Sequence, residues 1–380
     1  MKKNTFMEFF AGGGMARAGL GTEWECVFAN DISATKAESY VANWGDADLA
    51  IGDVFDLTMR QLPTITTDLA WGSFPCQDLS LAGNGAGLNG ERSTAFWGFW
   101  NLLKGLIAND RKPRMIVLEN VVGTLTSRGG EDFAAIIKAV VAGGYRVGAM
   151  VVDAVHFVPQ SRPRVFFVAI DNSLAVPDTL CTDGPLPSWH NASLIRGFHQ
   201  LPSRLKDQWL WWNLPSKAGP TATLDDLVEA DPSGVAWHTA AETKALLMMM
   251  TPLNRKKVIE AQAAGKLKVG TIYRRTRLGE QRAEVRFDGI SGCLRTPSGG
   301  SSRQTIIIVR GSEIRTRLIS PRETARLMGL PDTYELPARY NDAYHLCGDG
   351  VVVPVVEHIA KSILNPMMKA NRHTALRSVA

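Results

Sequence analysis

Short apolar runs alternate with helix-like segments over the first 170 residues of the chain. Residues 4–10 (NTFMEFF) and 25–31 (ECVFAND) have the apolar character of buried strands, and residues 11–20 (AGGGMARAGL) read as a glycine turn entering a helix. Four later segments also resemble buried strands: residues 66–73, 114–121, 146–155 and 164–171. Because strands separated by helices form a parallel sheet with helices on both faces, the pattern predicts an α/β fold with a doubly wound, mostly parallel sheet.

The pattern changes after residue 172. From there prolines, glycines and tryptophans are scattered without a sustained helical or strand period, which indicates a second, loop-rich domain. Residues 319–330 (ISPRETARLMGL) read as a capped helix, and residues 350–364 (GVVVPVVEHIAKSIL) as an apolar helix that returns to the first domain. We therefore expect one domain of residues 1–172 and 335–380 and a smaller one of residues 173–334.

Composition narrows the class of protein. The chain has 380 residues, of which 45% are hydrophobic and 21% charged, and no apolar run reaches the roughly 20 residues that a membrane helix needs. Its five cysteines are widely spaced and form no CxxC pair, so we expect free thiols, no zinc site and no disulfide framework. These features predict a soluble, cytoplasmic protein without a bound metal. The net charge is +5, yet residues 251–290 alone carry ten Lys or Arg against four acids.

Polar residues follow several of the predicted strands. Ligands of an open parallel sheet bind beyond the carboxyl ends of its strands, so one edge should collect Gly12 to Gly14, Asp31, Asp53, Cys76 and Glu119. A glycine turn lets the backbone approach a ligand closely, Asp31 suits a pair of ribose hydroxyls, and Asp53 can accept from an adenine amino group. The structural alternatives are a packing turn for the glycines and a cap or turn role for each acid. The combination favours a nucleoside-bearing cofactor.

Cys76 stands between Pro75 and Gln77, after an apolar run and before a glycine-rich segment. A thiolate exposed at the end of a strand is a strong nucleophile. The alternative is a buried structural cysteine, but the polar residues that follow describe a loop, where buried cysteines are rare. The glycines would also allow this segment to close over a substrate as a lid.

Charged residues accompany two later strands. Glu119 and Asn120 end a very apolar strand, where a carboxyl group can keep its proton and act as a donor; a salt bridge or a helix cap is the alternative. Gln160, Arg162 and Arg164 precede another strand, and side chains two residues apart on an extended segment share a face. We therefore expect the two guanidinium groups to converge on one site, rather than to serve as surface charge.

These motifs, in this order, resemble the DNA (cytosine-5)-methyltransferase family. The set comprises Phe10-x-Gly12-x-Gly14, Asp31, Asp53, Pro75-Cys76-Gln77, Glu119-Asn120-Val121, Gln160-x-Arg162-x-Arg164, SPRETARLMGLPD and GDGVVVPVVEHIA. The match covers residues 5–170 and 315–365, and the variable part of the family between them reads the target sequence. The resemblance implies a class I methyltransferase fold, S-adenosyl-L-methionine as cofactor with S-adenosyl-L-homocysteine as product, and double-stranded DNA as substrate.

The resemblance also implies a role for each motif. The Cys76 thiolate would attack carbon 6 of a flipped-out cytosine, so that carbon 5 becomes able to attack a methyl group. Glu119 would donate a proton to N3, Arg164 would bind O2, and Arg162 would hold the thiolate and its loop. Two positions depart from the family: Asp349 stands where an asparagine is usual, and Pro163 separates the arginines. The expected cofactor residues are Phe10, Ala11, Gly12, Gly14, Asp31, Ile32, Asp53, Val54, Pro75, Asp349 and Gly350.

The basic window and the loops near it are candidates for DNA contact, because Lys and Arg neutralise phosphates and polar side chains on loops reach base edges. A solvated surface is the alternative for any single residue. The expected contacts are Gln77, Ser80, Gln160, Lys256, Lys257, Arg274, Arg275, Arg295, Ser298, Arg303 and Gln304. We expect a monomer. Two other functions stay open: cytosine-5 methylation of transfer RNA, as in one branch of the family, and a catalytically silent DNA-binding protein. The recognised bases and a link to a restriction nuclease stay open too.

Overall fold

The computed structural model describes residues 3–75, 94–217, 219–220, 222–277, 279–296 and 303–377. The expected site residues Cys76, Gln77, Ser80 and Ser298 lie outside these ranges, as does the glycine-rich segment expected to act as a lid. The chain divides into two compact units. Unit 1 consists of Met1–Val152, Pro163–Ser216 and Val353–Ala380, and unit 2 of Asp153–Arg162 and Lys217–Val352.

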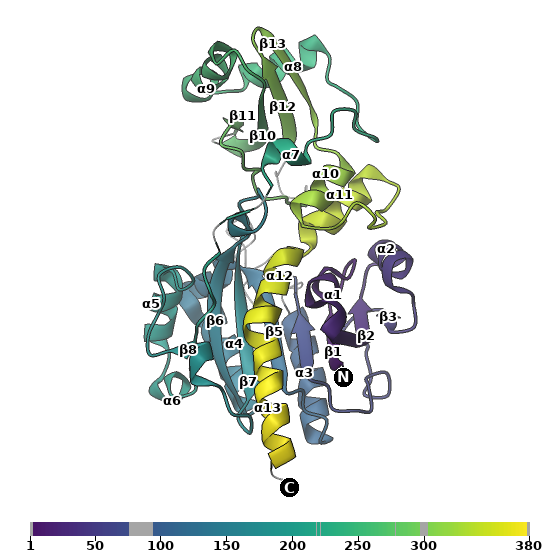
Figure 1. Ribbon diagram of the computed structural model, residues 1–380, viewed down its shortest axis with the longest axis vertical. Coiled ribbons are helices and arrows are strands. Elements are labelled where there is room, and N and C mark those ends of the chain that lie inside the picture. The colour runs from purple at the N-terminus through teal and green to yellow at the C-terminus, as the bar shows by residue number, and fades with distance from the viewer. Residues whose placement is uncertain are drawn as a thin grey trace. The chain divides into compact units, whose positions relative to one another are not determined.

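Unit 1 is built on a seven-stranded sheet with the order β3-β2-β1-β4-β5-β7-β6 (Figure 1). β1 pairs in parallel with β2 and β4, β2 with β3, and β4 with β5, whereas β7 runs antiparallel to β5. The predicted α/β fold with a mostly parallel sheet is therefore confirmed. The strand order reverses between β1 and β4, and ligands of such sheets bind beyond the carboxyl ends at this point. The strands are β1 Asn4–Phe9, β2 Trp24–Asp31, β3 Leu49–Ile51, β4 Leu69–Gly72, β5 Met115–Val121, β6 Tyr145–Asp153 and β7 Pro163–Asp171.

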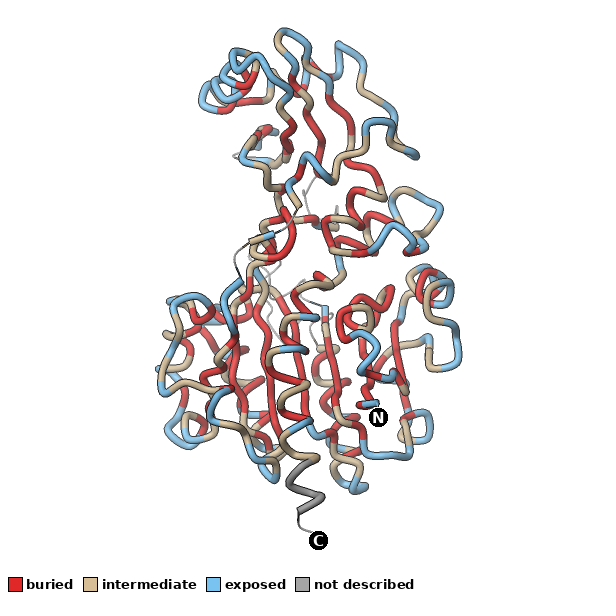
Figure 2. The backbone as a smooth tube through the Cα atoms, in the orientation of Figure 1, coloured by how far each residue is buried: buried red, intermediate tan, exposed pale blue. Residues whose placement is uncertain are grey.

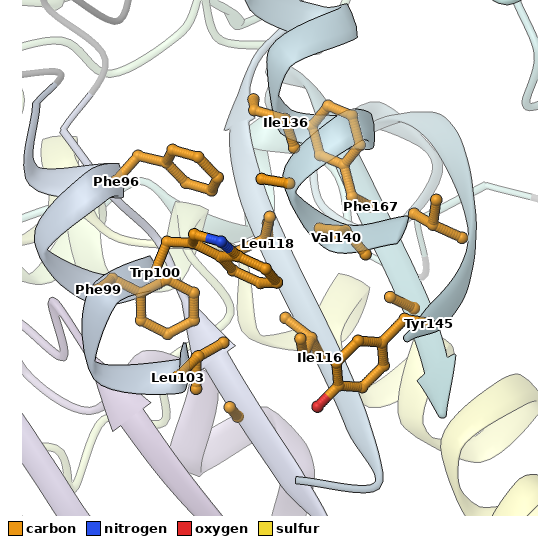
Figure 3. Close-up of a cluster of buried hydrophobic side chains, with 14 of the residues drawn as sticks. Phe96, Phe99, Trp100, Leu103, Ile116, Leu118, Ile136, Val140, Tyr145 and Phe167 are labelled. Atoms are coloured by element: carbon orange, nitrogen blue, oxygen red, sulfur yellow. The ribbon is translucent and has the colours of Figure 1, made fainter. Parts of the chain in front are cut away.

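Helices cover this sheet because its central strands are apolar on both faces (Figure 2). Figure 3 shows Phe99 and Leu103 of α3, and Val140 of α4, packed around Ile116 and Leu118 of β5. These five side chains are at most 1% exposed, so the core sits directly beneath the strand that carries Glu119. The helices of this part of unit 1 are α1 Met15–Leu20, α2 Ala34–Trp44, α3 Ala95–Ala108 and α4 Glu131–Ala142.

Residues 173–216 pack with unit 1, although the sequence predicted that they belong to the smaller domain. They contain α5 Ala192–Gln200, α6 Ser203–Lys206 and the short strands β8 Cys181–Thr182 and β9 Trp211–Trp212. Aromatic contacts hold them there, for example between Trp209 and Phe133 of α4, whose ring centroids are 6.0 Å apart. Residues 335–352 pack with unit 2 instead. The assignment of cofactor and target-recognition roles to the two predicted domains stays a prediction.

The end of the chain returns to the sheet of unit 1, as the apolar pattern of residues 350–364 indicates. α12 Val353–Ile359, a π-helical turn at Ala360–Leu364 and α13 Asn365–Arg377 follow one another. α12 packs on α1 so closely that a Cβ on Gly19 would lie 2.4 Å from Cβ of Val356. Trp24 at the start of β2 donates from Nε1 to Oδ1 of Asn365 over 2.8 Å.

Unit 2 contains an antiparallel four-stranded sheet with the order β11-β10-β12-β13. α8 Ala240–Met248 and α9 Pro252–Ala263 cover one face through an apolar cluster that includes Leu246, Val258, Ile272 and Ile307. In the same unit the Arg317 and Glu323 side chains, 0% and 1% exposed, form an ion pair of 2.6 Å. The remaining elements are β10 Lys268–Arg277, β11 Glu280–Arg286, β12 Thr305–Arg310, β13 Glu313–Leu318, α7 Leu224–Leu227, α10 Pro321–Leu327 and α11 Tyr340–Asp349. Among the described residues, no helix has the length and apolar character needed to span a membrane.

Candidate active site and cofactor site

The glycine turn after β1 has an unusual backbone. Phe10, Gly12 and Gly14 take φ values of 58°, 56° and 76°, so alternate residues lie in the left-handed region. Glycine adopts this region without strain, whereas a residue such as Phe10 does so at a cost that usually marks a functional site. The turn closes through a hydrogen bond from Gly14 N to Ala11 O of 2.8 Å, and Ala11 N donates to Asn30 O of β2 over 2.9 Å. These bonds hold the turn against the end of the neighbouring strand.

Asp31 lies at the end of β2, next to this turn. Its Oδ2 accepts from Gly12 N and its Oδ1 from Ser33 N, each over 2.8 Å. Ser33 in turn caps α2 by accepting from Lys36 N, which explains why the helix begins directly after the acid. Each carboxylate oxygen still has acceptor capacity, so the group can receive a pair of ribose hydroxyls while its orientation is held by the backbone. This donor and acceptor set fits the nucleoside part of S-adenosyl-L-methionine.

The other expected cofactor residues of unit 1 follow β2, β3 and β4. Ile32 is 68% exposed, Val54 is 4% exposed, and Asp53 Oδ1 accepts from Phe55 N over 3.0 Å. Pro75, after β4, is exposed and is the last described residue before Cys76. The sequence was therefore sufficient to select residues from four strand ends of one sheet edge.

Asp349 and Gly350 lie in unit 2, at the end of α11 and just beyond it. The Asp349 carboxylate accepts a hydrogen bond from the Thr296 hydroxyl. A contact of Asp349 or Gly350 with the cofactor stays a prediction.

The catalytic carboxyl group predicted at the end of β5 has a defined partner. Glu119 Oε1 lies 3.2 Å from Nε of Arg164, and the two side chains are 8% and 16% exposed. The antiparallel register of β5 and β7 brings them together, because Val121 pairs with Arg164 and Glu119 with Phe166. The interpretations of Glu119 as a catalytic group and as a salt-bridge partner are thus compatible: the carboxyl group is buried, paired and fixed in direction.

Asn120 links this strand to the segment that leads to Cys76. Its Nδ2 donates to the backbone oxygen of Phe74 over 3.0 Å, and its Oδ1 accepts from Val121 N and from the Thr124 hydroxyl. Phe74 is two residues before Cys76. The chain that follows β4 is therefore tied to the residue next to Glu119.

Arg162 and Arg164 do not share partners, in contrast to the expectation from their spacing. Arg162 is 2% exposed and lies in unit 2, where Nη1 donates to Leu294 O and Nη2 to Gly348 O and Gly350 O, each over 2.8 Å. A guanidinium group with five donors suits this set of loop carbonyls. The spacing argument failed because the chain passes from unit 2 to unit 1 between the two residues. A role of Arg162 beside the thiolate stays a prediction.

Two expected DNA contacts, Gln160 and Gln304, are buried inside unit 2 at 0% and 2% exposure. Gln160 Nε2 donates to Leu327 O over 2.8 Å and its Oε1 accepts from Leu294 N over 3.0 Å. Gln304 Nε2 donates to Cys293 O over 3.4 Å. In this structure their amide groups bridge loops, so a direct base contact would require these bonds to open.

The basic residues lie on both sides of the sheet of unit 2. Lys256 and Lys257 are exposed on α9, which covers the face that carries Ile272. Arg274 shares that face, because it pairs with Ala283, whereas Arg275 pairs with Arg282 on the opposite face and forms an ion pair with Glu284. Arg295 is exposed, and Arg303 packs over the Tyr340 ring at 5.6 Å. One flat contact with DNA cannot engage all of them.

Two residues behind the glycine turn, Glu8 and Trp44, were not expected from the sequence. Glu8 is 2% exposed, and burial raises its pKa to about 8. Its carboxyl group accepts from the backbone N–H groups of Ala16 and Arg17, and Oε2 has no hydrogen-bond partner among the described residues. An acid in the middle of the apolar run NTFMEFF was the available signal for Glu8. Trp44 has no comparable signal in its local sequence.

The fold and the glycine turn with its paired acid define a class I methyltransferase that binds a nucleoside-bearing cofactor. The described part of the chain holds no group of three His, Cys, Asp or Glu side chains arranged to bind a metal ion. The sequence profile of the family described as C-5 cytosine-specific DNA methylase matches residues 4–365, and the chain belongs to this family.

Known relatives extend over nearly the whole chain. The chain is 25% identical over 361 residues to the Type II methyltransferase M.HhaI of Haemophilus parahaemolyticus, covering 94% of this chain and 93% of the relative. It is 26% identical over 367 residues to M.NlaX of Neisseria lactamica, covering 94% and 95%. The crystal structure of the Dnmt2 methyltransferase of S. pombe matches with a TM-score of 0.61 at 19% identity, covering 96% of this chain and 99% of the other. The protein is thus a DNA (cytosine-5-)-methyltransferase that uses S-adenosyl-L-methionine.

Proposed function

We propose that this enzyme methylates carbon 5 of a cytosine flipped out of a specific double-stranded DNA sequence, through a covalent adduct with Cys76. The observation that carries the proposal is the buried pair of Glu119 and Arg164, 3.2 Å apart, on the strand whose next residue, Asn120, bonds to Phe74. A carboxyl group and a guanidinium group fixed beside the segment that leads to a cysteine are the set that addition to a cytosine ring requires.

The chemistry follows from the electronic poverty of carbon 5. When the Cys76 sulfur forms a bond to carbon 6, electron density moves to carbon 5, which then forms a bond to the methyl group. The negative charge that develops at N3 and O2 is neutralised by a proton from Glu119 and by the Arg164 guanidinium. Loss of the proton on carbon 5 and of the Cys76 thiolate restores the aromatic ring. The bound cofactor supplies an electrophilic methyl group and departs as S-adenosyl-L-homocysteine.

Arg164 has two tasks in this proposal. Its Nε holds Glu119 in one orientation, and its terminal nitrogens would bind O2 of the cytosine; in the structure Nη1 donates to the Pro163 carbonyl over 2.9 Å. Pro163 restricts the backbone at this position. Arg162 acts at a distance by joining the loops at Leu294 and Gly350 within unit 2.

The cofactor would lie along the strand ends of unit 1. The turn from Phe10 to Gly14 would contact the methionine and adenosine parts, the Asp31 carboxylate would receive the ribose hydroxyls, and Asp53 with Val54 would border the adenine. Ile32, 68% exposed, offers an apolar face to the ring. Unit 2 would contribute Asp349 and Gly350 and would read the DNA. We further propose that the enzyme works as a monomer in the cytoplasm.

Transfer of tritiated methyl groups to duplex DNA and to transfer RNA tests the proposal. We expect label in the DNA only, at cytosines that bisulfite sequencing places in one short sequence. The Cys76→Ser variant should give no transfer, because a serine hydroxyl is a far weaker nucleophile at neutral pH. Label in transfer RNA instead of DNA would overturn the choice of substrate, and undiminished transfer by Cys76→Ser would overturn the mechanism.

A further inference from the structure

Trp44, the last residue of α2, bonds directly to the cofactor turn. Its indole Nε1 donates to Gly13 O over 3.0 Å. The ring also fills the space beneath the next residue, because a Cβ on Gly14 would lie 2.4 Å from Trp44 Nε1 and 3.0 Å from Cε2 of Tyr40. The helix that begins shortly after Asp31, at Ala34, therefore returns to the glycine turn at its other end.

Two hydrogen bonds act on one peptide group of this turn. Trp44 binds the oxygen of the Gly13–Gly14 peptide, and the nitrogen of the same peptide donates to Ala11 O over 2.8 Å. Since the peptide group is planar, the two bonds together fix its orientation. That orientation sets the left-handed φ of Gly14, 76°, and the path of the backbone into α1.

Arg17 holds the indole ring from the other side. Its guanidinium carbon lies 5.2 Å from the Trp44 ring centroid and 5.7 Å from that of Tyr40. Nη1 donates to the Tyr40 hydroxyl over 2.8 Å and lies 3.5 Å from Oδ2 of Asp48. Because Arg17 belongs to α1 and Trp44 to α2, the stacking joins the helices that follow β1 and β2.

We infer that Trp44 is a positioning residue that sets the affinity of the enzyme for S-adenosyl-L-methionine by holding the Gly13–Gly14 peptide. The inference rests on the proposed cofactor site at Phe10 to Gly14 and Asp31. Trp44 is only half-buried, in contrast to the fully buried side chains of the apolar core. Its loss should therefore loosen the turn more than it destabilises the protein.

The Trp44→Phe variant tests this inference because it keeps an aromatic ring under Gly14 and removes the N–H donor. We expect the KM for S-adenosyl-L-methionine and the Kd for S-adenosyl-L-homocysteine to rise about fivefold, the effect of removing one hydrogen bond. The kcat, the KM for DNA and the melting temperature should change little. Tyr40→Phe, which only frees Arg17 from its hydroxyl partner, should raise the same KM by a smaller factor.

Trp24→Phe is the matched control. Trp24 also uses its Nε1 donor, in the 2.8 Å bond to Asn365, but it lies at the amino end of β2, away from the turn. This variant should leave the KM for the cofactor unchanged, whereas an equal rise in both tryptophan variants would reduce the effect to general loosening and overturn the inference.

Asp31→Asn separates the inference from the proposed site. If Asp31→Asn raises the KM for the cofactor and Trp44→Phe does not, the site is right and the role of Trp44 is wrong. If neither variant changes this KM, the cofactor binds elsewhere and both ideas fall.

Discussion

Glu8 makes the stability of unit 1 depend on pH in a direction that can be calculated. Its pKa is raised from 4.5 to about 8, chiefly because burial disfavours the charged carboxylate, while the positive charge of Arg17 opposes the shift. Between these values the folded protein keeps the proton and the unfolded chain loses it. The proton is thus bound more tightly by the folded state, and the free energy of unfolding falls as pH rises through this window, by about 1.4 kcal/mol per pH unit.

The Glu8→Gln variant removes this dependence while keeping the size of the side chain. Relative to the wild type, the variant should gain a few kcal/mol between pH 5 and pH 8, and the difference should stay constant above pH 8. Urea unfolding of both proteins at unit steps from pH 5 to pH 9, followed by tryptophan fluorescence, measures it. A difference between the two proteins that does not change with pH would show that the Glu8 carboxyl group titrates normally in the fold, and the reasoning would be refuted.

Three other predictions concern the catalytic pair, the core of unit 2 and the surface that binds DNA. Glu119→Gln should lower kcat by about 100-fold or more, because the amide cannot donate a mobile proton, while the Kd for DNA in a filter-binding assay stays within a factor of two. Arg317→Leu leaves the buried Glu323 carboxylate without its partner and should lower the free energy of unfolding by about 3–5 kcal/mol; a decrease below 1 kcal/mol in urea titrations would contradict this. The double variant Lys256→Gln and Lys257→Gln should reduce the slope of log Kd against log salt by about 0.9 for each phosphate that the protein no longer neutralises, and an unchanged slope would place the DNA on another surface.

The strand ends of the sheet could be predicted because the chemistry there is local. β1, β2 and β5 are continuous apolar runs, and each ends at a turn or an acid that the chain itself displays: Gly12, Asp31 and Glu119. The parallel arrangement then brings these ends to one edge without further information. The same reasoning selected residues that the fold does place side by side, as the bond from Gly12 N to Asp31 shows.

Tertiary contacts account for what the sequence did not reveal. The spacing of Arg162 and Arg164 predicts a common face, but the partners of Arg162 are carbonyl groups more than 130 residues away in the chain, at Leu294 and Gly348. Gln160 looks like a polar loop residue until its amide is found bonded between Leu327 and Leu294. The place of residues 173–216 in unit 1 likewise depends on contacts such as that of Trp209 with Phe133. No local pattern carries this information.

The account depends most directly on bond formation between the Cys76 sulfur and carbon 6 of cytosine. Duplex DNA with 5-fluorocytosine at the target position tests it, because fluorine cannot leave as the proton does and the adduct therefore persists. After incubation with S-adenosyl-L-methionine and proteolysis, mass spectrometry should find the methylated nucleotide attached to the peptide that contains Cys76. An adduct on another residue, or methyl transfer to ordinary duplex DNA without any trapped adduct, would contradict the central claim.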